Sequence, residues 1–314
     1  MTDFATANLA VASFAIQAEA LTKNYNKWKR AIDGLSVEIP AGGLVGLIGR
    51  NGSGKTTFMK LCAGLLNVTG GSLKVFGQAP MDNLEVLSNL VYSHPGLEYE
   101  PSLQLETILR NYARMFLDFD FEFASKLLRY FDLDSGLKYK QLSQGMVSTF
   151  NFSCGLACRA KLTLLDEPLL GMDITVRKAA YEILLRDYNE YPRTILLSSH
   201  LLAELEGILS DILLIDEGKL VFFCSLDDLR QSAYQLEGDR ASLEAFCEGK
   251  PLIYRKNGEL QSLAVVYEPL DESTKAEAGR WQLRLSAVRV EDLCTYLTRE
   301  SKEGELACLW EKTN

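Results

Sequence analysis

The glycine-rich stretch GRNGSGKTT, residues 49–57, constrains the fold of this chain more than any other feature of its sequence. It fits the spacing G-x-x-x-x-G-K-[ST] and directly follows the apolar run LVGLI at residues 44–48. A loop of this kind, between a buried strand and a helix, turns backbone N–H groups toward a phosphate, and the positive end of the helix points the same way. The stretch therefore predicts an α/β protein that binds a nucleoside triphosphate.

Two residues at the end of this loop have separate expected roles. The ammonium of Lys55 would reach the β and γ phosphates, and the hydroxyl of Thr56 would ligate Mg²⁺. The other residues of the loop expected to bind the nucleotide are Gly49, Arg50, Asn51, Gly52, Ser53, Gly54 and Thr57.

A second apolar stretch, LTLLDEP at residues 162–168, ends in two adjacent carboxylates. Asp166 is expected to hold Mg²⁺ through water, and Glu167 to orient or deprotonate the attacking water, because phosphoryl transfer depends mainly on positioning. An acidic strand end is common by itself. The functional interpretation is favoured here because a phosphate loop needs such a strand beside it.

Three further motifs complete a recognisable set: QLSQGM at residues 141–146, GMD at 171–173, and His200 after TILLSS. In their order and spacing, the five motifs resemble those of the ATP-binding cassette (ABC) family over about residues 14–230. The resemblance implies a RecA-like α/β core with an antiparallel β subdomain and an α-helical subdomain. It also implies ATP and Mg²⁺ as cofactors.

The same resemblance assigns roles to residues outside the phosphate loop. Tyr25 would stack on adenine, with Trp28 a weaker candidate. His200 would act in catalysis beside Glu167 and Lys55. Two cassettes of this family sandwich ATP, so Ser143 and Gly145 of one subunit would face the nucleotide of the other. A second ABC ATPase subunit is therefore an expected partner, in a homodimer or a heterodimer.

This sequence departs from the common family pattern at three places. One of them, PLLGMD at residues 168–173, replaces a more usual Thr-Asn or Thr-Ser before the last three residues and is expected to matter little. Residues 142–146 read LSQGM where LSGGQ is commonest, but the serine and the second glycine are kept. His94, in LVYSHPG, stands where a Gln or Glu normally contacts the metal. Three roles are open for His94: a place in the metal site through a water, a cationic contact to the γ-phosphate, or hydrogen bonding within its own loop.

The composition of the chain restricts its expected location and its expected partners. No apolar run among the 314 residues approaches the roughly 20 needed to span a bilayer. The N-terminal stretch has no basic region before its apolar residues, which argues against a secretory signal. A net charge of −9 disfavours nucleic acid as a partner. We therefore expect a cytoplasmic protein that lies on the inner face of the membrane through a separate transmembrane permease.

The resemblance favours the ATPase subunit of an ABC transporter, of a bacterial exporter type. One alternative is an ABC ATPase that acts in translation or on DNA, but the chain has neither a second cassette nor long coiled coils. Another is a regulatory cassette in a heteromeric transporter, which only His94 supports.

The pattern of residues changes near position 230, so two domains are expected: a nucleotide-binding domain at 1–230 and an accessory or regulatory α+β domain at 231–314. In the second, helices are predicted at about 241–248 and 290–299, and strands in YQLEG, WQLRLSA and both arms of a hairpin around Asn257. The polar segment PLDESTKAEAG at 269–279 is predicted to be a loop.

Overall fold

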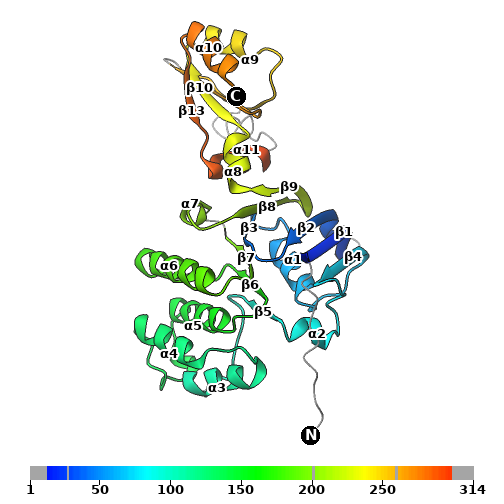
Figure 1. Cartoon of the computed structure of the whole chain (residues 1–314), viewed down its shortest axis with the longest axis vertical. Helices are drawn as coiled ribbons and strands as arrows, with labels where there is room; N and C mark the ends of the chain where they lie inside the picture. The colour runs from blue at the N-terminus through cyan, green and yellow to red at the C-terminus, as the bar shows by residue number, and fades with distance from the viewer. Residues whose placement is uncertain (1–12, 27, 200–201, 259–260, 299–314) are drawn as a thin grey trace, which may run out of the picture. The chain divides into compact units, whose positions relative to one another are not determined.

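The structure, a computed structural model, describes residues 13–26, 28–199, 202–258 and 261–298. The chain divides into two compact units, residues 1–223 and 224–314 (Figure 1).

A six-stranded sheet in the order β5-β6-β7-β3-β8-β9 forms the core of the first unit. Neighbouring strands from β5 to β8 pair in parallel, and the residues of β3, β6 and β7 are all buried. Continuous apolar runs are typical of parallel strands covered on both faces. The strands are β3 (Leu44–Ile48), β5 (Leu90–Ser93), β6 (Leu162–Asp166), β7 (Thr194–Ser198), β8 (Asp211–Asp216) and β9 (Lys219–Ser225).

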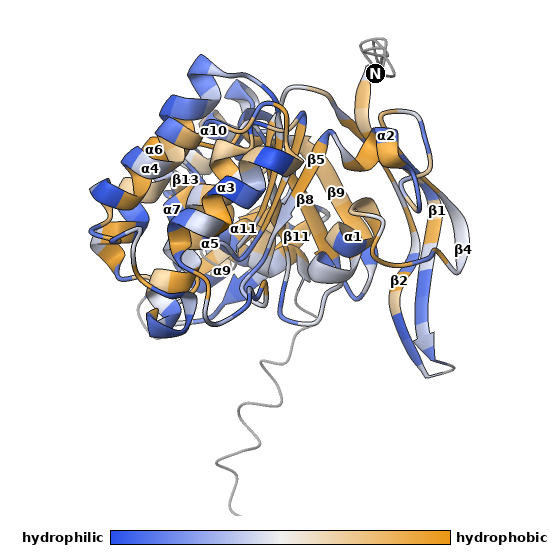
Figure 2. Ribbon diagram, turned by 90° about the horizontal axis from the view of Figure 1, so that it is seen from below, coloured by the Kyte–Doolittle hydropathy of each residue, from blue (hydrophilic) through white to orange (hydrophobic). Residues whose placement is uncertain are grey.

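Helices cover both faces of this sheet. Figure 2 shows apolar strands between α1 (Lys55–Cys62) on one side and α5 (Gln144–Ala157) and α6 (Ile174–Glu190) on the other. The short helix α7 (Leu202–Leu205) precedes β8. The expected RecA-like α/β core is thus confirmed.

A three-stranded antiparallel sheet in the order β2-β1-β4 forms the expected β subdomain. Its strands are β1 (Phe14–Asn26), β2 (Lys29–Pro40) and β4 (Gly70–Val75), and α2 (Leu84–Leu87) follows them. Ile16, Leu21 and Ile32 of this sheet share one apolar core with Phe58 of α1. The packing fixes β1 and β2 beside the start of α1.

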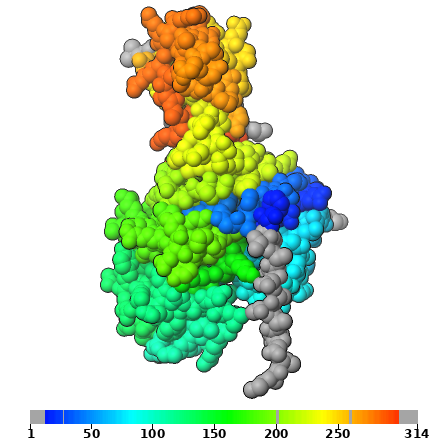
Figure 3. Space-filling view, in the orientation of Figure 1, coloured from blue at the N-terminus to red at the C-terminus, as the bar shows by residue number. Residues whose placement is uncertain are grey.

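The helical subdomain has an apolar core of its own. It contains α3 (Leu105–Met115), α4 (Phe121–Tyr130), the 3₁₀ turn η1 (Tyr139–Gln141) and α5. Leu105 and Ile108 pack there with Leu128 and with Phe150 of α5. In Figure 3 its teal surface is separate from the blue and cyan surface of the β subdomain.

The second unit begins near α8 (Leu226–Gln231), so the boundary expected at residue 230 falls at the end of this helix. Its four-stranded antiparallel sheet has the order β11-β12-β10-β13. The succession β-α-β-β-α-β is that of a ferredoxin-like fold. The elements are β10 (Tyr234–Gly238), α9 (Arg240–Cys247), β11 (Leu252–Lys256), β12 (Ser262–Val266), α10 (Glu272–Arg280), β13 (Arg284–Ala287) and, after the motif, α11 (Val290–Thr298).

The prediction of a loop at residues 269–279 is wrong, because Glu272–Arg280 form helix α10. The side chain of Asp271 caps this helix by accepting a hydrogen bond from the backbone N–H of Thr274 at 2.7 Å. Thr274 and Ala278, four residues apart, are buried on one face. The polar composition concealed a short amphipathic helix with a good N-cap residue.

Candidate nucleotide-binding site

The phosphate loop needs glycine at position 54. Gly54 has φ of +112°, and a Cβ there would lie 2.6 Å from the carbonyl oxygen of Ala31. The carbonyl of Gly54 then accepts the hydrogen bond from Phe58 that begins α1. Only glycine combines this backbone angle with such a close approach, so Lys55 becomes the first residue of the helix.

The side chain of Lys55 folds into the loop. Its ammonium donates hydrogen bonds to the carbonyls of Gly49 at 2.7 Å and Arg50 at 3.1 Å. Burial lowers the pKa of Lys55, while the nearby carboxylates of Glu167 and Asp166 raise it; the net direction is downward. Rotation about the last side-chain bonds of Lys55 would bring its ammonium from these loop carbonyls to a bound phosphate.

Ser53 adds a further polar group to the loop. Its side chain is buried, and within the part of the chain described here its hydroxyl has no hydrogen-bond partner. A buried hydroxyl without a partner is unfavourable unless a ligand or water completes it. The Ser53 hydroxyl is therefore available to donate a hydrogen bond to a bound phosphate.

A cavity of about 330 Å³ lies over the loop and α1, a size typical of small-molecule sites. Three cationic side chains contribute to it, which suits a polyphosphate. Gly49, Arg50 and Ser53 do not line it. The residues that do are Tyr25, Lys29, Arg30, Ala31, Asn51, Gly52, Gly54, Lys55, Thr56, Thr57 and Glu167.

Tyr25, the residue expected to stack on adenine, lies at the edge of this cavity on β1. Its hydroxyl is 3.2 Å from the hydroxyl of Thr57, and 48% of the residue is exposed. The ammonium groups of Lys23 and Lys29 lie 5.8 and 5.9 Å from the ring centre. The ring is thus anchored at one end and accessible to a base.

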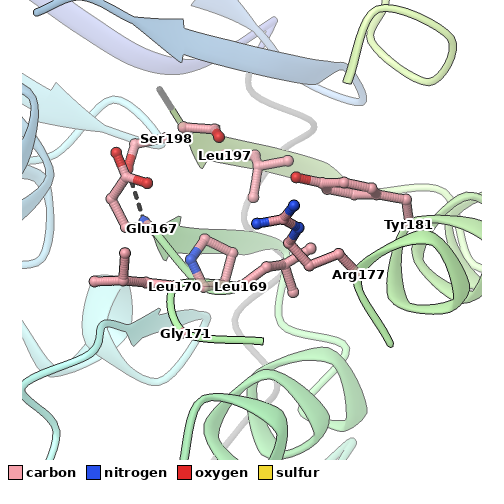
Figure 4. A pocket seen from close by; sticks show the side chains of 10 residues that line it. Glu167, Leu169, Leu170, Gly171, Arg177, Tyr181, Leu197 and Ser198 are labelled. Atoms are coloured by element: carbon pink, nitrogen blue, oxygen red, sulfur yellow. Dashed lines mark hydrogen bonds between the residues drawn. The ribbon is translucent and has the colours of Figure 1, made fainter. Parts of the chain in front are cut away.

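Asp166 and Glu167 are joined through Ser198, which the sequence analysis did not single out. The Ser198 hydroxyl donates to Oδ1 of Asp166 at 2.6 Å. It also accepts from the backbone N–H of Glu167 at 2.9 Å, the bond drawn as a dashed line in Figure 4. The register of β6 and β7 places Asp166 opposite Ser198. Glu167 has φ of +45°, which is uncommon for a residue other than glycine. The serine therefore links the carboxylate that is expected to bind the metal to a strained stretch of backbone.

A second, smaller cavity of about 50 Å³ adjoins Glu167 and is lined by residues 167–171, Arg177, Tyr181 and residues 197–199. Arg177 and Tyr181 project from α6 toward it in Figure 4. The guanidinium of Arg177 pairs with Glu204 of α7 at 2.9 Å. The ion pair joins the helix after the GMD motif to the helix that follows β7.

The oxygen groups expected to hold Mg²⁺ suit that ion. Mg²⁺ prefers oxygen ligands and keeps several waters. The Asp166 side chain is buried at the end of β6, and Thr56 is exposed in the wall of the cavity. Together they offer a carboxylate and a hydroxyl, as the motif requires.

His94 lies against Tyr92, with ring centroids 4.8 Å apart and ring planes 27° from parallel. Burial and the charge of Lys60 lower the pKa of His94, and Asp166 opposes this. The net direction of this shift favours the neutral ring.

The LSQGM motif packs against the GMD segment of the same chain. Ser143 caps α5, accepting from the backbone N–H of Met146 at 3.3 Å. A Cβ on Gly145 would lie 2.7 Å from the carbonyl oxygen of Gly171. Neither Ser143 nor Gly145 lines the phosphate-loop cavity. His200 lies outside the described residues.

Comparison with known proteins gives concordant matches. The family model described as ABC transporter matches residues 32–170. The bacitracin transport ATP-binding protein BcrA of Bacillus licheniformis is 30% identical over 224 residues, covering 70% of this chain and 72% of that protein.

Two solved structures illustrate the likeness in fold. An ATP-binding subunit of an ABC transporter is 26% identical with a TM-score of 0.62, and the match covers 69% of this chain and 92% of that one. The ATP-binding cassette MJ0796, in a dimeric post-hydrolysis state with ADP and Pi, is 19% identical with a TM-score of 0.58, and the match covers 67% and 98%. Within the described ranges, no helix is long and apolar enough to cross a membrane.

Proposed function

Because this chain belongs to the ABC transporter family as an ATP-binding subunit, we propose that it powers an exporter whose transmembrane permease is a separate polypeptide. The exporter assignment rests on the similarity to a bacitracin transport ATP-binding protein and on the short LSQGM signature. Through its permease the subunit would lie on the inner face of the cell membrane.

The observation that carries the ATPase assignment is the cavity that joins the phosphate loop to Glu167. Loop amides and Lys55 bind the phosphates of ATP, and the Tyr25 ring receives the adenine. Glu167 orients the attacking water, while Ser198 holds its backbone in place. Thr56 and Asp166 would hold Mg²⁺, which neutralises charge on the β and γ phosphates when bound.

A second copy of this chain completes the site in our proposal. Ser143 and Gly145 do not reach the cavity of their own phosphate loop, so a signature motif has to come from elsewhere. The similar ATP-binding cassette MJ0796 is dimeric in its post-hydrolysis state, which supports a dimer here. In a two-fold dimer, each signature would face the nucleotide of the other copy.

Nucleotide-driven dimerisation tests this function. Glu167→Gln keeps the phosphate-binding groups but removes the carboxylate that positions water, so ATP should persist in a closed dimer. Light scattering after size exclusion should give a dimer with Mg-ATP and a monomer without nucleotide.

The matched control is the double variant Glu167→Gln with Ser143→Arg. It should bind ATP and stay monomeric, because the bulky cation blocks the facing site. A Glu167→Gln variant that stays monomeric when saturated with ATP would refute the symmetric dimer.

A further inference from the structure

Both carboxylate oxygens of Asp166 are held by hydroxyl groups of neighbouring strands. Ser198 on β7 donates to Oδ1 at 2.6 Å, and Tyr92 on β5 donates to Oδ2 at 3.2 Å. Asp166 is only 3% exposed, so these bonds replace much of the solvation of a buried carboxylate. The two hydroxyls, which come from the strands on either side of β6, fix the orientation of the carboxylate.

The sheet register explains why Tyr92 reaches this carboxylate. Tyr92 lies opposite Leu164 in the parallel pairing of β5 and β6. Side chains of paired residues share a face, and Asp166 lies on that face two residues beyond Leu164. The tyrosine is long enough to reach along β6 with its hydroxyl.

His94 is two residues beyond Tyr92 and lies on the same side, with its ring stacked on the tyrosine ring at 4.8 Å. Stacked rings at this separation restrict one another. A displacement of His94 would therefore free the ring whose hydroxyl holds Asp166.

We infer that Tyr92 is a positioning residue for the metal-binding carboxylate of Asp166, and that His94 acts through the Tyr92 ring rather than as a ligand of Mg²⁺. The inference rests on the proposed ATPase function and deepens it. With Oδ1 and Oδ2 each accepting one hydroxyl, each oxygen keeps a lone pair that could accept a hydrogen bond from a metal-bound water. His94 is thereby coupled to the metal site without contacting the metal.

Cation affinity measured apart from turnover tests this inference. Full-length protein saturated with ADP is titrated with Mn²⁺, and free Mn²⁺ is followed by electron paramagnetic resonance. Tyr92→Phe keeps the ring and its packing but removes the hydroxyl, and should weaken Mn²⁺ binding by about tenfold, as is typical for groups that orient a metal ligand. Affinity for a fluorescent ATP analogue in EDTA should stay unchanged.

His94→Ala tests the coupling through the ring, because alanine removes the stacked ring and supplies no oxygen ligand for the metal, whereas the Gln common in the family would. It should also weaken Mn²⁺ binding, and in the Tyr92→Phe background it should add nothing, because both changes release the same carboxylate. Tyr112→Phe is the matched control, since its hydroxyl contacts the hydroxyl of Tyr99 in the helical subdomain. It should leave Mn²⁺ binding unchanged.

Three outcomes would overturn the inference: unchanged Mn²⁺ affinity in Tyr92→Phe, unchanged affinity in His94→Ala, or effects of the two variants that multiply. The last would mean that His94 acts on the metal independently. Failure of the proposed function looks different, because the wild-type protein would then bind neither the ATP analogue nor Mn²⁺ with ADP.

Discussion

At the scale of single residues, Tyr25 combines an anchored hydroxyl with an accessible ring. Its hydroxyl lies 3.2 Å from Thr57, next to the residue expected to ligate Mg²⁺. Tyr25→Ala should weaken ATP binding by about 1–3 kcal/mol, the range found for base stacking on aromatic side chains. Equilibrium binding of a fluorescent ATP analogue measures the loss.

Two substitutions separate stacking from anchoring at this position. Tyr25→Phe keeps the ring and loses the hydroxyl contact, so it should retain most of the affinity, and Tyr25→Trp should do the same. If Tyr25→Phe loses as much affinity as Tyr25→Ala, the contact with Thr57 matters and stacking does not.

The sequence identifies residues whose role follows from a short local motif, as for Lys55, Thr56 and Asp166. It did not reveal Tyr92 or Ser198, because their contacts with Asp166 depend on which strands neighbour β6 and in what register. A signal for Ser198 was present, since a serine ends the buried strand TILLS. Spacing along the chain does not show that this serine faces a carboxylate.

At the scale of elements, α5 is joined to the GMD segment by one side-chain hydrogen bond. The hydroxyl of Ser148 donates to the carbonyl of Leu170 at 2.6 Å, and Ser148 is buried. Ser148→Ala removes this hydrogen bond, so it should lower the free energy of unfolding by about 0.5–1.5 kcal/mol. A shift of the urea denaturation midpoint measures the change.

Ser153 on the same helix provides the comparison. It is equally buried, but its hydroxyl donates to the carbonyl of Thr149 within α5, at 2.8 Å. Such a bond within one helix adds little to stability, so Ser153→Ala should shift the midpoint less. Equal shifts of the two midpoints would show that the hydrogen bond between α5 and Leu170 contributes no more to stability than the bond within α5.

Strongly patterned elements could be predicted from the sequence, while weakly patterned ones could not. The apolar runs of β3 and β6 predicted two strands of the α/β core, and the resemblance of the motifs implied the helical subdomain. α10 was missed because it buries few residues and is otherwise charged. The ferredoxin-like topology of the second unit was not predicted either, since the strand order β11-β12-β10-β13 depends on long-range pairing.

At the scale of the whole molecule, the central claim is that ATP hydrolysis needs the phosphate loop of one copy and the signature of another. The chain has one phosphate loop with Lys55 and one signature with Ser143. Two variants, each expected to be inactive alone, separate these two roles. Lys55→Ala should lose nucleotide binding, and Ser143→Arg should bind ATP in its own loop but fail to complete the partner's site.

The most direct test is to mix Lys55→Ala with Ser143→Arg and to measure ATPase activity. In a heterodimer, the loop of the Ser143→Arg copy faces the signature of the Lys55→Ala copy, which gives one intact site and one doubly defective site. Each heterodimer has one intact site, so the mixture should hydrolyse ATP, at a rate below that of the wild-type protein, although neither variant does alone. A mixture as inactive as its components would contradict the account.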